Sequence, residues 1–245
     1  MNASRNVAVI KVIAATFVFL FMAVGAEGQA LSVLPVNIFF PQGQRTAVLT
    51  ITNQGNSSTS VQIRAYAWSQ RNGEDHLADT DAVLASPPIA TIAPGDKQVV
   101  RLILRELPQE KEATYRILVD QIPPPAEPGI VHVVLRMSIP IFAQPAFRAA
   151  CHVDFHVERE AAQLFLVGVN DCLRHEAIRD IALSTSDGQS IKTGPGELPY
   201  VLAGAIRRWP LAALQALSPA TETLHLTAHS DTGAIDEQVR VVPAP

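Results

Sequence analysis

The sequence is short of the features that mark nucleic-acid-binding proteins, membrane proteins and most enzymes. Charged residues make up only 17% of the chain, and the formal net charge of -4 offers no basic excess for a phosphate backbone. It contains neither a Gly-x-Ser-x-Gly motif nor a phosphate-binding glycine loop. After Val24 no stretch is long and apolar enough to cross a bilayer, which takes about 20 residues. We therefore expect no enzyme, no cofactor, no nucleic-acid partner and no stable membrane insertion.

Metal-ligand clusters are also missing from the pattern. His152, Asp154 and His156 share one face of a predicted strand, and His225 and His229 form a second pair. A protein metal site needs three or four converging ligands, so solvated strand faces explain these residues better. We expect no metal site.

The first 30 residues have the pattern of a secretory signal peptide. Arg5 and Lys11 precede an apolar run that ends at Val24 and is too short to span a bilayer, and small residues follow it. Cleavage after Ala26 and cleavage after Ala30 both fit the small-residue rule. The sequence therefore predicts an exported protein whose mature chain begins near residue 31.

The chain has only two cysteines, Cys151 and Cys172. Two apolar runs, Cys151–Val157 and Gln163–Val169, predict a hairpin that brings the start of one strand beside the end of the next. An exported compartment permits a disulfide, and the hairpin would place the two thiols close enough to form one. The alternative is a pair of buried free thiols.

Prolines and turn residues separate short apolar runs along the whole mature chain, which favours strands over helices. About seven strands before residue 145 are typical of an immunoglobulin-like β-sandwich. The pattern restarts after Gln144–Arg148, so we predict an all-β protein with two immunoglobulin-like sandwich domains, at residues 31–145 and 146–245. Ala203–Leu217 stays ambiguous between strand and helical turn. The strands expected in the first domain are Leu31–Phe40, Ala47–Thr52, Val61–Trp68, Gln98–Leu104, Tyr115–Ile122 and Ile130–Phe142. Those expected in the second are Cys151–Val157, Leu164–Asn170, Ile178–Ser184, Leu198–Ala203, Thr223–Ala228 and Val239–Val242.

A series of short motifs in the first domain follows a recognisable order. They are Gln62–Trp68, Ser86–Ile89, Ile92–Gly95, Gln98–Leu102, Tyr115–Pro123 and Arg136–Ala143. Together, at these spacings, they resemble the periplasmic pilus-assembly chaperones of the chaperone–usher pathway. Tyr115–Asp120 and Ser138–Ala143 look most like the archaic, spore-coat-U-like branch. The resemblance covers residues 31–145 and is looser beyond them.

The resemblance implies a donor strand, called G1 in that family, which is lent to a pilus subunit whose own sandwich lacks one strand. Ile130–Phe142 has the required alternation, because every second residue from Val131 to Ile141 is apolar. The register implied by the family places four of these side chains, Val131, Val133, Leu135 and Met137, in the subunit. Taken alone, the alternation favours an ordinary core-facing strand, and the flanking motifs shift the interpretation to a donor strand.

The resemblance also implies a basic anchor for the carboxylate at the subunit's C-terminus. The positions that carry this charge in the better-known branch hold Asn37 and Pro140 here, and neither side chain is positive. Arg116 is our first candidate for the anchor, expected beside Arg136–Ser138, and Arg101 is the second. Each could instead be a solvated or salt-bridging arginine.

The partners implied are pilus subunits with an incomplete sandwich and an outer-membrane usher, which Val83–Ile92 would face, and the location implied is the periplasm. An exposed apolar strand also invites weak self-association of the free protein. The alternative function is a secreted structural adhesin or pilus component with two immunoglobulin-like domains, because fold alone does not separate the two.

Overall fold

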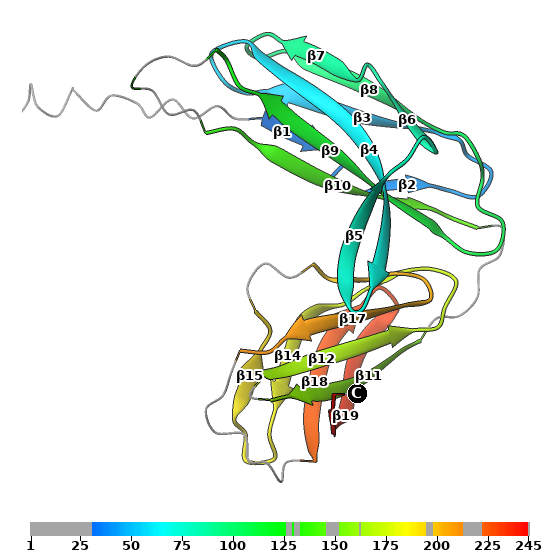
Figure 1. Ribbon diagram of the computed structural model, residues 1–245, viewed down its shortest axis with the longest axis vertical. Helices are drawn as coiled ribbons and strands as arrows, with labels where there is room; N and C mark the ends of the chain where they lie inside the picture. The colour runs from blue at the N-terminus through cyan, green and yellow to red at the C-terminus, as the bar shows by residue number, and fades with distance from the viewer. Residues whose placement is uncertain are drawn as a thin grey trace, which may run out of the picture.

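A computed structural model describes residues 31–125, 129, 133–145, 152–161, 163–194, 198–212 and 222–244. The predicted signal peptide lies outside these residues. The described residues form strands and contain no helix, which confirms the all-β prediction with two β-sandwiches (Figure 1). No helix in these ranges is long and apolar enough to span a bilayer. The strands are β1 (Leu31–Leu34), β2 (Ile38–Phe40), β3 (Thr46–Asn53), β4 (Thr59–Arg71), β5 (Glu74–Asp79), β6 (Val83–Ser86), β7 (Ile89–Ile92), β8 (Lys97–Leu104), β9 (Ala113–Ile122), β10 (Arg136–Ala143), β11 (Val153–Glu160), β12 (Gln163–Asn170), β13 (Glu176–Ala177), β14 (Arg179–Ser184), β15 (Ser190–Lys192), β16 (Tyr200–Val201), β17 (Ala205–Pro210), β18 (Thr223–Ser230) and β19 (Gly233–Pro243).

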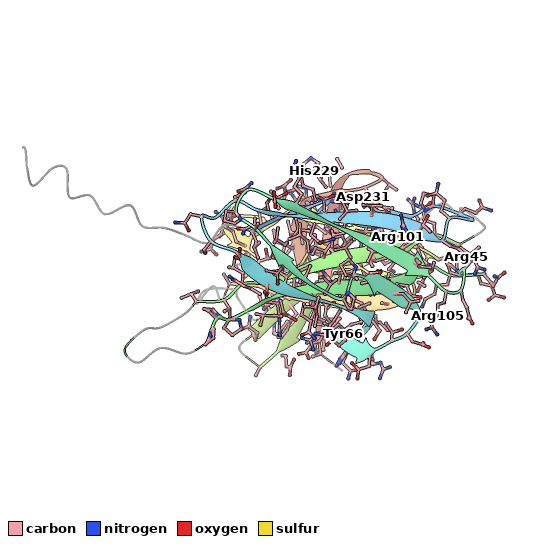
Figure 2. The ribbon with its side chains drawn as sticks, turned by 90° about the horizontal axis from the view of Figure 1, so that it is seen from above. Arg45, Tyr66, Arg101, Arg105, His229 and Asp231 are labelled. Carbon is pink, nitrogen blue, oxygen red and sulfur yellow. The ribbon has the colours of Figure 1, made fainter. Side chains whose placement is uncertain are left out.

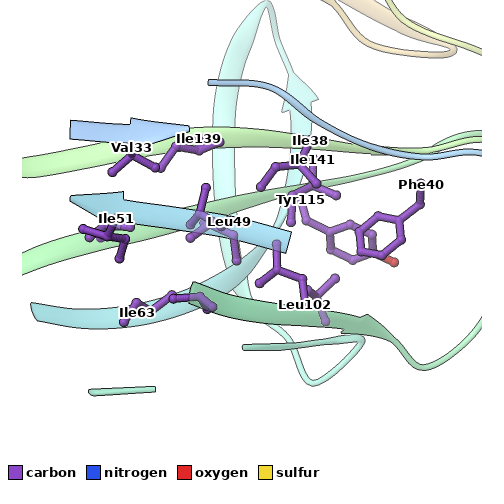
Figure 3. Packing of buried hydrophobic residues seen from close by; sticks show 14 of the residues in the cluster. Val33, Ile38, Phe40, Leu49, Ile51, Ile63, Leu102, Tyr115, Ile139 and Ile141 are labelled. Carbon is purple, nitrogen blue, oxygen red and sulfur yellow. The ribbon is translucent and has the colours of Figure 1, made fainter. Parts of the chain in front are cut away.

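The first sandwich, formed by β1 to β10, packs two sheets face to face. One sheet has the strand order β1-β3-β8-β6, and the other has β2-β10-β9-β4-β5 with β7 paired to β4. Alternation along each strand sends every second side chain inward. In β8, for example, Val100, Leu102 and Leu104 are fully buried while the residues between them face outward. Figure 3 shows the resulting core between the sheets.

The strand predicted over residues 31–40 is two strands that belong to different sheets. β1 pairs antiparallel with β3, whereas β2 pairs parallel with β10. Pro35 lies between them and has no N–H to donate to a ladder, so pairing is interrupted there. The chain thus crosses from one sheet to the other at this point and leaves Leu34 and Val36 each 66% exposed.

The second sandwich, formed by β11 to β19, is built on a seven-stranded sheet with the order β15-β14-β18-β19-β11-β12-β17. Ile191 in β15 and Trp209 in β17 stand at opposite ends of this order yet share one buried cluster, so the sheet folds over its own core. The predicted hairpin is confirmed, because β11 and β12 pair antiparallel from Val153 to Glu160. In the ambiguous segment, residues 205–210 form the edge strand β17, and residues 213–217 lie outside the described ranges.

A long hairpin, β4–β5, projects from the first sandwich toward β17 of the second (Figure 1). Its tip is Asn72-Gly73, and both residues have a positive φ, of 52° and 81°, as the favoured two-residue hairpin turn requires. The Gly73 carbonyl accepts a hydrogen bond from the Arg208 backbone N–H at 3.3 Å. A Cβ on Gly73 would lie 2.5 Å from the Arg208 side chain, so only glycine fits this contact without displacement.

A small apolar cluster joins the two sandwiches below this hairpin. Trp68 and Phe142 come from the first sandwich, and Ala177, Tyr200 and Leu202 come from the second. The Trp68 and Tyr200 rings meet edge to face with their centroids 5.7 Å apart, a favoured geometry for aromatic pairs. The cluster therefore adds a buried interface to the contact at the hairpin tip.

Candidate functional site

Strand β10 has a partner along its whole length on one side only. On that side it pairs antiparallel with β9 from Arg136 to Ala143. On the other side β2 reaches only Ile141 to Ala143. Among the described residues no strand pairs with residues 136–140 on this second side, so their backbone groups form an open sheet edge.

The chain just before β10 is exposed and apolar. Val133 is 83% exposed, Val134 46% and Leu135 39%. This segment is tied to β9 through Gln121, whose backbone N–H donates to the Leu135 carbonyl at 2.9 Å. An apolar strip therefore leads directly into the open edge of β10.

The apolar row of the predicted donor strand changes its surroundings along its length. Ile139 and Ile141 point into the core of their own sandwich (Figure 3), and Met137 packs partly against it. Val133 and Leu135 are exposed and do not belong to that core. Val131, the fourth predicted donor residue, lies outside the described residues. The row is thus a core strand at its end and a solvent-exposed strand at its beginning.

An ion-pair network lies on the outer face of β9 and β10. Asp120 accepts from Arg64 Nη2 at 2.7 Å and also from Arg136 Nε. Burial by itself would raise the pKa of Asp120, but the hydrogen bonds from the two arginines lower it below its ordinary value overall. The network fixes the register in which Arg136 stands opposite Asp120.

The observed register corrects the expected position of Arg116. It lies opposite Pro140 and not beside residues 136–138, because Arg136 pairs with Asp120. The pairing of Ile141 with Ile38 brings Asn37 to the same level, so Asn37, Pro140 and Arg116 stand in one row. Arg116 therefore places a positive charge in the row where the two family positions carry none.

Alternation along β9 puts Arg116 on the face turned toward the second sandwich. Tyr115 and Ile117 belong to the core, so the residue between them points outward. Its guanidinium stacks on Trp68, with Cζ 3.7 Å from the ring centroid, and Tyr200 lies 5.9 Å away. Arg116 is 4% exposed, and its buried Nη2 has no hydrogen-bond partner.

Burying a charge without an ionic partner costs free energy, because the charge leaves water and no opposite charge compensates for it. Burial lowers the pKa of Arg116, and attraction to Asp75 partly offsets this. The group remains a cation at neutral pH, since arginine starts far above it. Arg116 is therefore a buried cation with one unsatisfied hydrogen-bond donor, Nη2.

The second candidate, Arg101, occupies a different part of the molecule. It lies on β8 opposite Val48 of β3, in the other sheet of the first sandwich. Its neighbours Val100 and Leu102 are buried, so Arg101 points to the outer face of that sheet (Figure 2). The structure does not bring Arg101 and Arg116 together.

Polar side chains from both sandwiches surround the Arg116 site. Asp75 accepts hydrogen bonds from Trp68 Nε1 and from Gln70 Nε2, each at 3.0 Å. Its other oxygen lies 3.2 Å from Nη1 of Arg207, which comes from β17. The Tyr200 hydroxyl donates to Asn37 Oδ1 at 3.1 Å. Sequence reasoning missed the contacts of Arg207 and Tyr200 because they join residues up to 163 positions apart, which only the docking of the two sandwiches brings together.

A second polar contact joins the sandwiches at the beginning of β9. Glu112 accepts from the His175 backbone N–H at 2.8 Å and contacts its ring Nδ1 at 2.7 Å. The His175 ring stacks on Phe142 with the centroids 3.5 Å apart. Both sandwiches therefore contribute to a network of hydrogen bonds around the Arg116 row.

The predicted disulfide falls partly outside the described residues. Cys172 is disulfide-bonded, and its sulfur accepts from the backbone N–H of His152 at 3.1 Å. Cys151, the predicted partner, lies outside the described ranges. Within those ranges no cluster of three or more histidine, cysteine or carboxylate side chains could hold a metal ion.

Two packed β-sandwiches are also the fold of solved pilus-assembly chaperones. Residues 30–148 match the family model described as "Pili and flagellar-assembly chaperone, PapD N-terminal domain". The first sandwich therefore belongs to this family of N-terminal chaperone domains.

Two curated relatives support this membership. The chain is 28% identical to the chaperone protein PapD of Escherichia coli over 132 residues, which are 52% of this chain and 53% of PapD. It is 23% identical to the chaperone protein FimB/FhaD of Bordetella pertussis over 132 residues, 49% of this chain and 52% of that protein. The chain thus spans about half the length of the curated relatives it matches.

Solved structures match across both sandwiches. The CsuC–CsuE chaperone–tip adhesion subunit complex from archaic Csu pili of Acinetobacter baumannii aligns with a TM-score of 0.63 at 21% identity, covering 88% of this chain and 100% of that one. The chaperone YadV aligns with a TM-score of 0.61 at 17% identity, covering 86% and 98%. SafB of Salmonella enterica, in complex with the pilin SafA, aligns with a TM-score of 0.57 at 14% identity, covering 88% and 97%. At these identities the likeness shows the fold.

Proposed function

We propose that this protein is a periplasmic chaperone that binds unfinished pilus subunits by lending them the strand that leads into and forms β10. The observation that carries the proposal is the open edge of residues 136–140 next to the exposed Val133 and Leu135. An edge of this kind pairs with another chain through backbone hydrogen bonds, and its alternate side chains fill pockets in that chain. A pilus subunit with an incomplete sandwich offers both the missing strand position and the pockets.

The apolar strip is large enough to matter for a guest. Burying one aliphatic side chain contributes about 1.5–3 kcal/mol, so four predicted donor residues would supply roughly 6–12 kcal/mol before entropy costs. A small domain has a total stability of about 5–15 kcal/mol. Val133 and Leu135 would each contribute more than Met137, because part of the Met137 surface is already buried against the first sandwich. A guest sandwich that lacks a strand would therefore depend on this contact.

Arg116 is the proposed anchor for the carboxylate at the guest's C-terminus. Its buried Nη2 lacks a partner, and a charge-assisted bond from a carboxylate would satisfy it. The anchor stands in the same row as Asn37 and Pro140, but it projects from the neighbouring strand β9. Arg101 is a weaker candidate, since it lies on the outer face of the other sheet.

Two finer proposals follow from the resemblance and the relatives. The structures that resemble this chain include complexes with a tip adhesion subunit and with a pilin, which supports pilus subunits as its partners. An outer-membrane usher would receive the subunit, with β6 and β7 as the facing surface, where Leu84 is 41% and Ile89 56% exposed. We also propose that this protein belongs to the archaic branch of these chaperones.

Co-expression tests the proposal directly. The tagged chain is produced in a bacterial periplasm together with the small secreted proteins encoded beside its gene, and complexes are recovered by affinity and gel filtration. We expect a stable one-to-one complex with a partner that aggregates when expressed alone. Val133→Asp should abolish the complex, because it places a charge in an apolar pocket of the guest.

A matched control is Val99→Asp. Val99 is 54% exposed on the outer face of the other sheet, so the same substitution there should leave the complex intact. Equal recovery with Val133→Asp and with the unchanged chain would contradict strand donation. Recovery of the chain only within assembled fibres would instead favour the structural-component alternative.

A further inference from the structure

Three charged groups from the two sandwiches meet around Trp68. Arg116 from β9 and Arg207 from β17 are 4% and 7% exposed, and Asp75 from β5 lies close to both. Asp75 uses Oδ2 for Arg207 and Oδ1 for the Trp68 indole N–H. Arg116 makes no ion pair among the residues that the structure describes, and stacks on the face of the same indole.

In this arrangement both oxygens of the Asp75 carboxylate are taken by partners other than Arg116. A buried guanidinium normally takes the nearest carboxylate as its partner, because an uncompensated buried charge is costly. Asp75 attracts Arg116 electrostatically yet is bonded elsewhere. If Asp75 turned to Arg116, it would fill the position that an incoming carboxylate needs.

We infer that Arg207 is a positioning residue of the second sandwich that keeps Arg116 available by holding the Asp75 carboxylate away from it. The inference rests on the proposed role of Arg116 as a carboxylate anchor and adds that the anchor is complete only when the second sandwich is docked. Loss of Arg207 has two effects of the same sign. It frees the Asp75 Oδ2 to pair with Arg116 while Trp68 and Gln70 still hold Oδ1, and it removes positive charge from the site.

Nuclear magnetic resonance of the two indole N–H groups gives the readout. The chain has two tryptophans. Trp68 stacks on Arg116 and therefore reports the site, whereas Trp209, bonded to the Leu198 carbonyl at 3.1 Å, reports the fold of the second sandwich. The probe is N-acetyl-alanyl-alanine with a free carboxylate, and the same peptide with a C-terminal amide is its control.

In the unchanged chain we expect the free carboxylate to shift the Trp68 signal saturably and the amide to leave it in place. Arg116→Ala should remove this response. Arg207→Met keeps the length of the buried stem but removes the charge, and should weaken carboxylate binding roughly tenfold while the Trp209 signal stays put. Arg208→Met is the matched control, because it removes a guanidinium that pairs with Glu158 and Glu160 and not with Asp75, while the side-chain stem and backbone that contact Gly73 remain.

A second substitution separates positioning from support of the fold. Adding Asp75→Asn to Arg207→Met should restore most of the affinity, because the amide oxygen still accepts from Trp68 but no longer competes as an anion for Arg116. If Arg207 only stabilised the interface, the double variant would bind more weakly than either single variant. That result, or carboxylate binding by Arg207→Met equal to that of the unchanged chain, overturns the inference.

Two further outcomes of the experiment would also overturn the inference. A response retained in Arg116→Ala removes Arg116 as the anchor and the inference with it. An unchanged chain that does not distinguish the acid from the amide overturns the inference, since it requires a site already assembled in the free protein. The chaperone function does not fail with it, because the co-expression experiment tests that function without the peptide.

Discussion

The guanidinium of Arg116 lies over the indole of Trp68, with Cζ 3.7 Å from the ring centroid, and both side chains are buried where the two sandwiches meet. The stacking holds the cation in one place without neutralising it. This combination suits a site that must stay open for an anion while the protein waits for its partner.

The first prediction concerns how much the unpaired Arg116 lowers the stability of the folded protein. Stacking on an aromatic ring returns up to about 2 kcal/mol, whereas burial of an ion costs several kcal/mol. Arg116→Met should therefore raise the free energy of unfolding by about 1 kcal/mol, measured by urea denaturation, while subunit complexes are lost. A variant that is less stable than the unchanged chain would show that Arg116 has a structural role.

The second prediction tests the change along the apolar row. Ile139 is 4% exposed in the core and Val133 is 83% exposed. Ile139→Ala should lower the free energy of unfolding by about 2–5 kcal/mol, and Val133→Ala should change it by less than about 0.5 kcal/mol. Urea denaturation of both variants gives the comparison, and similar losses in the two would refute the division between core and donor residues.

The third prediction concerns the hairpin tip that touches the second sandwich. Gly73→Ala combines a positive φ of 81° with a Cβ 2.5 Å from the Arg208 side chain. Gly43→Ala is the control, since Gly43 has a φ of 78° and a Cβ added there would meet no atom within 4 Å. Backbone strain should lower the free energy of unfolding of both variants by about 1 kcal/mol. The clash with Arg208 should lower that of Gly73→Ala further. Equal melting temperatures of the two variants would show that the tip contact does not hold the sandwiches together.

The fourth prediction is a pH dependence. The pKa of Asp120 is lowered in the folded chain, so its ion pairs stabilise the protein above the ordinary aspartate pKa of about 3.9, and this contribution disappears as the pH falls through the lowered value. Asp120→Asn should cost about 1 kcal/mol at pH 7 and nothing at the acid end. Denaturation of both proteins between pH 7 and pH 2 measures the difference. A constant difference over this range would mean that packing, and not charge, explains the effect.

The strand pattern was predictable because alternation is a local property. Residues 98–104 bury every second side chain toward the end of β8, and residues 164–170 lie in β12, where Val167 is buried on the other face as well. The alternation continued through Ile130–Phe142, however, while the paired strand begins only at Arg136. A two-residue alternation of apolar side chains does not show where strand pairing begins, so the start of β10 could be seen only in the structure.

The surroundings of Arg116 were not predictable from local patterns. Its register depends on the pairing of Arg136 with Asp120, and its neighbours Tyr200 and Arg207 come from the other sandwich. Tyr200 and Arg207 carry no motif, and Arg207 lies in the segment whose structure the sequence left ambiguous. The candidate residue was therefore accessible to sequence reasoning, but its dependence on the second sandwich was not.

β2 pairs with only the last three residues of β10, and this limits how far another strand could pair along the same edge. Within β10 a guest strand would have five residues beside it that are unpaired on that side, Arg136 to Pro140, a length of about 17 Å at 3.3–3.4 Å per residue. Beyond Pro140 the edge is already paired with β2, so pairing with a guest would have to end there. In the proposed complex, a guest chain that ended at this point would lie level with Arg116, so the extent of β2 would limit both the register and the length of the guest.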